Sequence, residues 1–118
     1  MKERGLDLMK VKFYLSGSGR SPVEEFLGEL SPELRANFLD AAILLEQGQI
    51  LSMPLSRNLS SIARGLHELR LKDWTGAYRF FYFIKRTDGI YFIHAFKKKS
   101  QDLPQKEIDL VLKRLKEI

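Results

Sequence analysis

The segment Gly65–Ser100 constrains the fold more than any other part of the chain. It reads GLHELRLKDWTGAYRFFYFIKRTDGIYFIHAFKKKS and contains three runs of strand-forming residues, at 66–72, 77–86 and 90–97. Turn residues join the runs, first Asp73-Trp74-Thr75-Gly76 and then Thr87-Asp88-Gly89. An Asp-Gly pair between such runs is typical of a β-hairpin. The segment therefore predicts three strands joined by turns.

The preceding residues predict one further strand and two helices. Apolar and basic residues alternate over 8–15, which indicates a strand with Met9, Val11, Phe13 and Leu15 on one face and Lys10 and Lys12 on the other. Ser21-Pro22 predicts a helix start with a capping box to Glu24, and this helix ends near Leu30. Ser31-Pro32 predicts a longer helix to about Gln47, with Gly48 just beyond its end. The longer helix has one apolar stripe, formed by Leu34, Phe38, Ala41, Ala42 and Leu45.

The rest of the chain completes a small α+β fold. Residues 49–64 form a polar, irregular connection that includes Pro54, and it either is mobile and closes over a groove or is merely a loop. A last helix begins at Pro104, with an apolar stripe at Ile108, Val111, Leu112, Leu115 and Ile118. We expect a single domain over 1–118, with a loose N-terminus at 1–7. Its order is β-α-α-β-β-β-α, with a twisted, mainly antiparallel sheet, a helical hairpin on one face and the C-terminal helix partly covering the other.

Alternation along the three strands assigns most of the charged side chains to one face. Glu68, Arg70 and Lys72 oppose Leu69 and Leu71 in the first strand. In the second, Arg79, Phe81, Phe83 and Lys85 oppose Tyr78, Phe80, Tyr82 and Ile84. In the third, Phe92, His94, Phe96 and Lys98 oppose Tyr91, Ile93 and Ala95. We expect a basin near the strand ends that the last helix leaves open, lined by Arg70, Lys72, Arg79 and Lys98. Phosphate is the first anion to consider for such a cluster.

Several side chains on this face have two interpretations. Phe81, Phe83 and Phe96 could stack on unpaired bases, but burial in the core is favoured because aromatic side chains contribute so much apolar area. Glu68 either pairs with Arg70 or Arg79 and orients it, or is a surface carboxylate. His94 has the pKa range for acid–base work, yet its position between Ile93 and Ala95 favours a buried structural histidine. His67 lies on the opposite phase from Arg70 and is a weaker candidate.

The charge distribution and the composition of the chain limit the class of partner and the kinds of catalysis to consider. Residues 1–60 carry 7 Lys and Arg against 8 Asp and Glu, whereas residues 61–118 carry 13 against 7. The excess positive charge favours a polyanionic partner, with a merely solubilising surface as the alternative. The chain has no cysteine, which excludes thiolate catalysis and fits a cytoplasmic protein. We expect no membrane span, no signal peptide and no cofactor. We also expect no metal, since two histidines on different strands do not make a metal site.

The order and spacing of four segments resemble the RelE/ParE superfamily of toxins from bacterial type II toxin–antitoxin modules, and within it the HigB-like, phage-derived branch. The segments are GRSPVEEFLGEL (19–30), GLHELRLK (65–72), AYRFFYF (77–83) and HAFKKKSQDLPQKEIDLVLKRL (94–115). The resemblance spans the chain from about Met9. It implies a small RelE-like fold and ribosome-dependent, metal-independent mRNA cleavage, in which the ribose 2′-OH attacks the adjacent phosphate.

The resemblance also implies residue roles. Its basic strand positions correspond to Arg70, Lys72 and Arg79, and the basic residue after its last strand corresponds best to Lys98. Lys97, Lys99, Glu68 and His94 are then candidates for contacts with RNA or the ribosome. Two departures leave the acid and the base unidentified: Glu68 stands where some members have lysine, and SQDLPQ (100–105) lacks a tyrosine that some members carry.

Neither free arginine nor free lysine is a ready base at neutral pH. Clustered cations favour loss of a proton from one of them, which makes Lys72 or Lys98 a candidate. Otherwise Arg70 and Arg79 would act electrostatically on the phosphate. Two other functions stay open, a ParE-type toxin that inhibits DNA gyrase and a nucleic-acid-binding module without toxicity. A toxin also implies a cognate antitoxin, usually with a helix-turn-helix domain in HigB-like modules.

Overall fold

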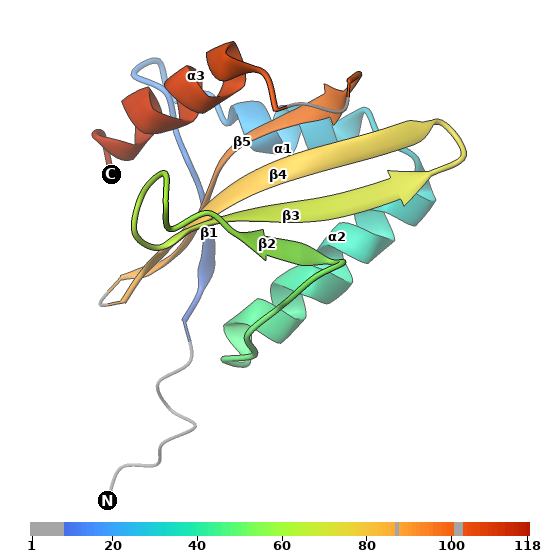
Figure 1. Cartoon of the computed structure of the whole chain (residues 1–118), viewed down its shortest axis with the longest axis horizontal. Helices are drawn as coiled ribbons and strands as arrows, with labels where there is room; N and C mark the ends of the chain where they lie inside the picture. Colours follow the sequence, from blue (N-terminus) through green and yellow to red (C-terminus); the bar gives the residue numbers. More distant parts are fainter. Residues whose placement is uncertain (1–8, 87, 101–102) are drawn as a thin grey trace, which may run out of the picture.

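A computed structural model describes residues 9–86, 88–100 and 103–118, and it shows an α+β fold with one five-stranded sheet. The three helices lie on the two faces of this sheet (Figure 1). The loose start predicted for residues 1–7 lies outside the described residues. In chain order the elements are β1 (Val11–Phe13), α1 (Pro22–Gly28), α2 (Pro32–Glu46), β2 (Ser56–Asn58), β3 (Leu66–Asp73), β4 (Gly76–Lys85), β5 (Gly89–Lys98) and α3 (Gln105–Leu115).

The sheet has the order β1-β5-β4-β3-β2. Strands β2 to β5 pair antiparallel, and β1 pairs parallel with β5. The three strands expected in the central segment are confirmed to within about one residue at each end. The predicted element order is wrong at one point, because the connection 49–64 contains the additional strand β2. This three-residue strand has no period-2 pattern of its own and forms by pairing with β3 at the edge of the sheet.

The helical hairpin of α1 and α2 covers one face of the sheet, as predicted. Every member of the predicted stripe of α2 is buried, and this stripe packs on side chains of β3, β4 and β5. Phe38 lies at the centre, with ring centroids 5.1 Å from Phe80 and 4.7 Å from Phe92. Gly48 follows α2 with a φ of 84°, the left-handed conformation typical of a helix C′ position.

A second apolar cluster lies between the opposite face and α3. Val111 of α3 is buried against this face, which contributes Leu66, Phe81 and Ile93. Tyr14 donates to Glu117 over 2.6 Å, which fastens the chain end after α3 to the segment after β1. No helix in the described part of the chain is long and apolar enough to cross a membrane.

A β-bulge in β5 corrects the predicted faces of that strand. Phe81 pairs with His94 and Tyr82 pairs with Phe92, so Ile93 is an extra residue in the ladder. Phe92 therefore packs against the helical hairpin, and not on the face of His94 as strict alternation predicts. Ile93 packs on the α3 side, where its carbonyl accepts a hydrogen bond from Arg114 over 2.9 Å.

Two local predictions near the N-terminus are also wrong. Leu15 lies just beyond β1 and is 60% exposed, so the apolar face of this strand ends at Phe13. Ser21 precedes α1 as predicted, but its side chain makes no capping hydrogen bond. The equivalent serine of α2, Ser31, does cap its helix, because its Oγ accepts from Leu34 N over 3.1 Å.

Candidate functional site

The register of β3, β4 and β5 arranges the predicted cations in two adjacent rows on the α3 side of the sheet. Lys72 pairs with Ala77, and Ala77 pairs with Lys98. In the next row Arg70 pairs with Arg79, which pairs with Phe96. Neighbouring strands are about 5 Å apart and same-face rows about 7 Å apart. Four cations therefore start from a patch of backbone roughly 10 Å by 7 Å.

Three of these cations line one hollow, which we call the basic hollow. Its volume is about 440 Å³. It is lined by Pro54, Leu55, Arg70, Leu71, Lys72, Ala77 and Arg79. The small side chain of Ala77 stands between Lys72 and Lys98 in their row, so no bulky group separates them on this face. The hollow can hold an anion against several positive groups at once.

The wall of the basic hollow includes residues that the sequence did not identify. Pro54 and Leu55 come from the connection before β2, and Arg70 N donates to Leu55 O over 2.8 Å. Arg70 Nη1 also contacts Met53 Sδ at 3.0 Å. Residues 53–55 of the connection therefore lie beside the hollow, and closure of the connection over it stays a prediction. Nothing in the sequence around Pro54 marks it as facing the cations.

Arg79 lines the hollow and is only 7% exposed. Its Nε is 3.6 Å from Oε2 of Glu68, which is itself buried at 3% exposure. Burial lowers the pKa of Arg79, the Glu68 carboxylate opposes this shift, and Arg70 and Arg57 add to it. Because an arginine pKa starts above 12, the guanidinium keeps its charge at neutral pH.

Glu68 connects two arginines. Its other oxygen, Oε1, is 3.9 Å from Nε of Arg57, which pairs with Glu68 across β2 and β3. Of the interpretations of Glu68, pairing with Arg79 is the one that the structure shows, and the surface carboxylate is wrong. A buried carboxylate beside two guanidiniums fixes their positions, so Arg79 is held in place before any ligand arrives.

The guanidinium group of Arg70 contacts Met53 through Nη1. Its Nε is buried and has no hydrogen-bond partner among the described residues. A buried donor without a partner costs free energy.

The other predicted lysines divide between two places. Lys98 is half-buried and shares the row of Lys72. Lys97 faces the helical-hairpin side, with Nζ 5.8 Å from the centre of the Tyr78 ring. Lys97 and Lys99 line a different hollow of about 510 Å³, beside Phe26 and Lys106. The structure therefore separates these two lysines from the basic hollow.

The structure does not bring His94 to the hollow. It is 9% exposed beneath α3, and its Nε2 lies 2.6 Å from Oε1 of Glu107. Burial lowers the pKa of His94, although Glu107 acts in the opposite direction. These contacts support the structural interpretation. His67 is on the opposite face and stacks on Tyr82 at 5.0 Å, and burial lowers its pKa as well.

The aromatic side chains of this face belong to the second core cluster. Phe81 is 1% exposed, and its ring stacks on Phe96 at 6.0 Å and on His94 at 6.1 Å. Phe83 and Phe96 are partly buried against the same cluster. The core interpretation is confirmed for Phe81, whereas Phe83 and Phe96 pack on the core and also line surface hollows.

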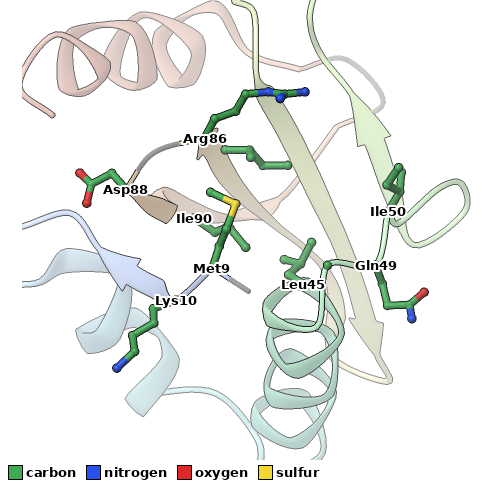
Figure 2. A pocket seen from close by; sticks show the side chains of 10 residues that line it. Met9, Lys10, Leu45, Gln49, Ile50, Arg86, Asp88 and Ile90 are labelled. Carbon is green, nitrogen blue, oxygen red and sulfur yellow. The ribbon is translucent and has the colours of Figure 1, made fainter. Parts of the chain in front are cut away.

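A larger hollow lies around the start of β5, away from the predicted cations. Its volume is about 590 Å³. Met9, Leu45 and Ile90 lie together at its centre, and Arg86, Asp88 and Gln49 lie around them (Figure 2). Within the described ranges no group of three or more histidine or acidic residues is placed to hold a metal ion.

The chain matches a family of known proteins. Residues 25–116 match the family model described as phage derived protein Gp49-like (DUF891). This range covers 92 of the 118 residues, from the middle of α1 to the end of α3, and so contains every residue of the basic hollow. No curated protein matches the chain.

Proposed function

Because this chain belongs to the phage-derived Gp49-like family, which is RelE-toxin-like in general, we propose that it is the toxin of a type II toxin–antitoxin module and cleaves mRNA on the ribosome. The observation that carries the proposal is the basic hollow, where the phosphate of an RNA backbone would meet Arg70, Lys72 and Arg79. RNA backbones are bound chiefly through such contacts.

The proposed reaction transfers the phosphate within the RNA. The 2′-oxygen forms a bond to the adjacent phosphorus while the bond to the 5′-oxygen breaks, leaving a cyclic phosphate and a 5′-OH end. The proton of the 2′-OH passes to a base and the 5′-oxygen takes up a proton. Arg79 and Arg70 would stabilise charge on the phosphate oxygens. Lys72 and Lys98, in the outer row, are the candidates for proton transfer.

A cleavage assay with purified chain, ribosomes and mRNA tests this proposal. Lys72→Ala is the sharpest variant, because Lys72 is exposed and its loss leaves the core intact. We expect cleavage within translated frames to fall about a hundredfold, as for loss of a donor that stabilises a transition state. Lys113→Ala removes an equal charge from an exposed position on α3 and is expected to leave cleavage unchanged.

Arg79→Ala and Lys98→Ala should also lower cleavage strongly, but Arg79 needs a folding control. Removing Arg79 leaves Glu68 buried with only Arg57 nearby, at a cost of about 3 kcal/mol of stability. The double variant Glu68→Gln/Arg79→Met removes both charges and should recover much of this loss without recovering cleavage. Unchanged cleavage in Lys72→Ala and Lys98→Ala would reject the site. Inhibited DNA supercoiling without cut mRNA would reject the nuclease in favour of a gyrase inhibitor.

We also propose a cognate antitoxin, with a helix-turn-helix domain, encoded beside this chain. Its acidic side chains would fill the basic hollow, or its bulk would keep the hollow away from the ribosome. The charge of residues 61–118, 13 Lys and Arg against 7 Asp and Glu, supports an acidic partner surface.

A further inference from the structure

The turn between β3 and β4 exposes the only tryptophan in the sequence. Trp74 is 90% exposed, although tryptophan is usually buried to a large extent. It stands in a two-residue loop between the paired residues Asp73 and Gly76. The loop lies at the far end of the β3–β4 hairpin, away from α3 (Figure 1). A single large apolar side chain in this position contributes nothing to either core.

The turn that carries Trp74 is held by a chain of hydrogen bonds. Asp73 accepts from the backbone and the hydroxyl of Thr75, and it also accepts from Ser31 Oγ over 2.8 Å. The Thr75 hydroxyl lies 2.6 Å from the Tyr78 hydroxyl. Ser31 is the N-cap of α2, so the turn is tied to the helical hairpin. The backbone beneath the indole is therefore fixed, which lowers the entropy lost when the indole binds a partner.

Two lysines lie near the turn that carries Trp74. Lys72 lies two residues before it and begins the row that ends at Lys98. On the other face Lys97 lies against Gly76, where its Cε would be 2.9 Å from an added Cβ. The one carboxylate of the turn, on Asp73, is occupied by Ser31 and Thr75, and their hydrogen bonds lower its pKa. An aromatic ring amid lysines suits single-stranded nucleic acid better than an apolar protein surface.

We propose that Trp74 is a stacking platform for an unpaired base of the RNA whose backbone occupies the basic hollow. The proposal rests on the proposed function and adds a specific contact to it. Every base presents a flat face, so stacking on the indole would add affinity with little dependence on sequence. Removing one such stack is expected to weaken RNA binding about tenfold.

The single tryptophan makes the test direct, because all indole fluorescence comes from Trp74. We would titrate the chain with an unlabelled single-stranded RNA of about ten nucleotides, which is long enough to span one binding site, and record the fluorescence. A matched RNA of abasic nucleotides has the same charges and no rings. The proposal predicts strong quenching by the first RNA and little by the second. Equal quenching by both RNAs, or binding without quenching, would overturn it, as would the absence of RNA binding.

Variants separate stacking from apolar contact. Trp74→Phe keeps a ring and should keep most of the affinity, measured by anisotropy of labelled RNA, whereas Trp74→Leu should lose about tenfold. Ile50→Ala is the control, since Ile50 is 91% exposed and borders the hollow of Figure 2. Unchanged thermal midpoints would show that each variant folds. Equal affinity for Trp74→Leu and the parent chain would overturn the proposal.

The ribosome assay distinguishes this inference from the proposed function. Trp74→Leu should raise the concentration of programmed ribosomes needed for half-maximal cleavage about tenfold and leave the maximal rate nearly unchanged, since the indole touches no reacting atom. Full cleavage without any effect of Trp74→Leu would reject the stacking and leave the nuclease in place. Base-dependent quenching without cleavage would support the stacking and reject the nuclease.

Discussion

At the scale of single residues, the serines of two Ser-Pro dipeptides behave differently. Ser21 and Ser31 each precede a proline at the start of a helix. Ser31 caps α2 and donates to Asp73, whereas Ser21 Oγ is buried without a hydrogen-bond partner among the described residues. The dipeptide predicted both helix starts, but the two serines differ in backbone conformation, with ψ of 93° at Ser21 and 155° at Ser31, and only the Ser31 hydroxyl accepts from an amide.

The pair gives a matched stability test. Ser31→Ala should lower the free energy of unfolding by about 1 kcal/mol, because α2 loses its cap and the turn loses a hydrogen bond. Ser21→Ala should change it by less than about 0.5 kcal/mol, because no cap is lost. Urea unfolding of both variants measures the difference. Losses of equal size would show that the two serines contribute equally to stability in solution.

Glu68 shows what alternation along a strand can predict for a single residue and what it cannot. Alternation placed it correctly on the face of Arg70 and Arg79. Its burial at 3% could not be inferred, because it depends on Arg57 in β2, a strand with no sequence pattern of its own. A carboxylate in a cationic strand was therefore open to two interpretations until its neighbours on the edge strand were known.

At the scale of elements, Gly65 holds the start of β3 against the end of β4. Its φ is 86°, and its carbonyl accepts from Ile84 N over 2.9 Å. A Cβ added here would lie 2.9 Å from the Phe83 ring and 3.1 Å from Ile84 O. Both the conformation and the space therefore require glycine.

Gly48 provides the control for an alanine test. It has nearly the same φ, 84°, but a Cβ there would meet nothing within 4 Å. Gly48→Ala should cost about 1 kcal/mol from conformation alone. Gly65→Ala should cost about 3 kcal/mol, since crowding against β4 adds to the strain. Thermal or urea unfolding gives both values, and indistinguishable losses would contradict the close contact with Phe83 and Ile84.

Elements with a strong period were predictable, and elements formed by pairing were not. The stripe of α2 and the strands β3, β4 and β5 follow from their own residues, because each buries one or both faces. The edge strand β2 forms through its partner. The bulge at Ile93 is equally invisible in the sequence, because IYFIHAF reads as unbroken apolar sequence in either phase.

At the scale of the whole molecule, the fold brings fewer of the predicted cations together than the sequence suggested. Arg70, Lys72 and Arg79 share the basic hollow, and Lys98 adjoins it in register. Lys97, Lys99 and His94 lie elsewhere. The part of the wall formed by Pro54 and Leu55 could not be predicted, because these residues reach the hollow only through the path of the connection after α2.

The proposed antitoxin leads to a prediction at this scale. The two proteins, expressed together from their shared operon, should purify as a complex, and the chain in that complex should not cleave mRNA. Ligand linkage should also raise the thermal midpoint of the toxin above that of the chain alone. Purification of the chain without a partner, or full cleavage by the complex, would contradict the proposed module. A Lys72→Glu variant should weaken a complex formed through the basic hollow, while Lys113→Glu should not.

The bulge at Ile93 determines which surface receives the end of β5. If β5 paired with β4 without the bulge, the residues after Phe92 would alternate strictly between the two faces. Lys98 would then point toward the helical hairpin and away from Arg79. A relative with one residue fewer at this point would keep both the inward phenylalanine and the outward lysine. Homologous chains should therefore be aligned with a single gap permitted here, since an ungapped alignment would equate side chains from opposite sides of the protein.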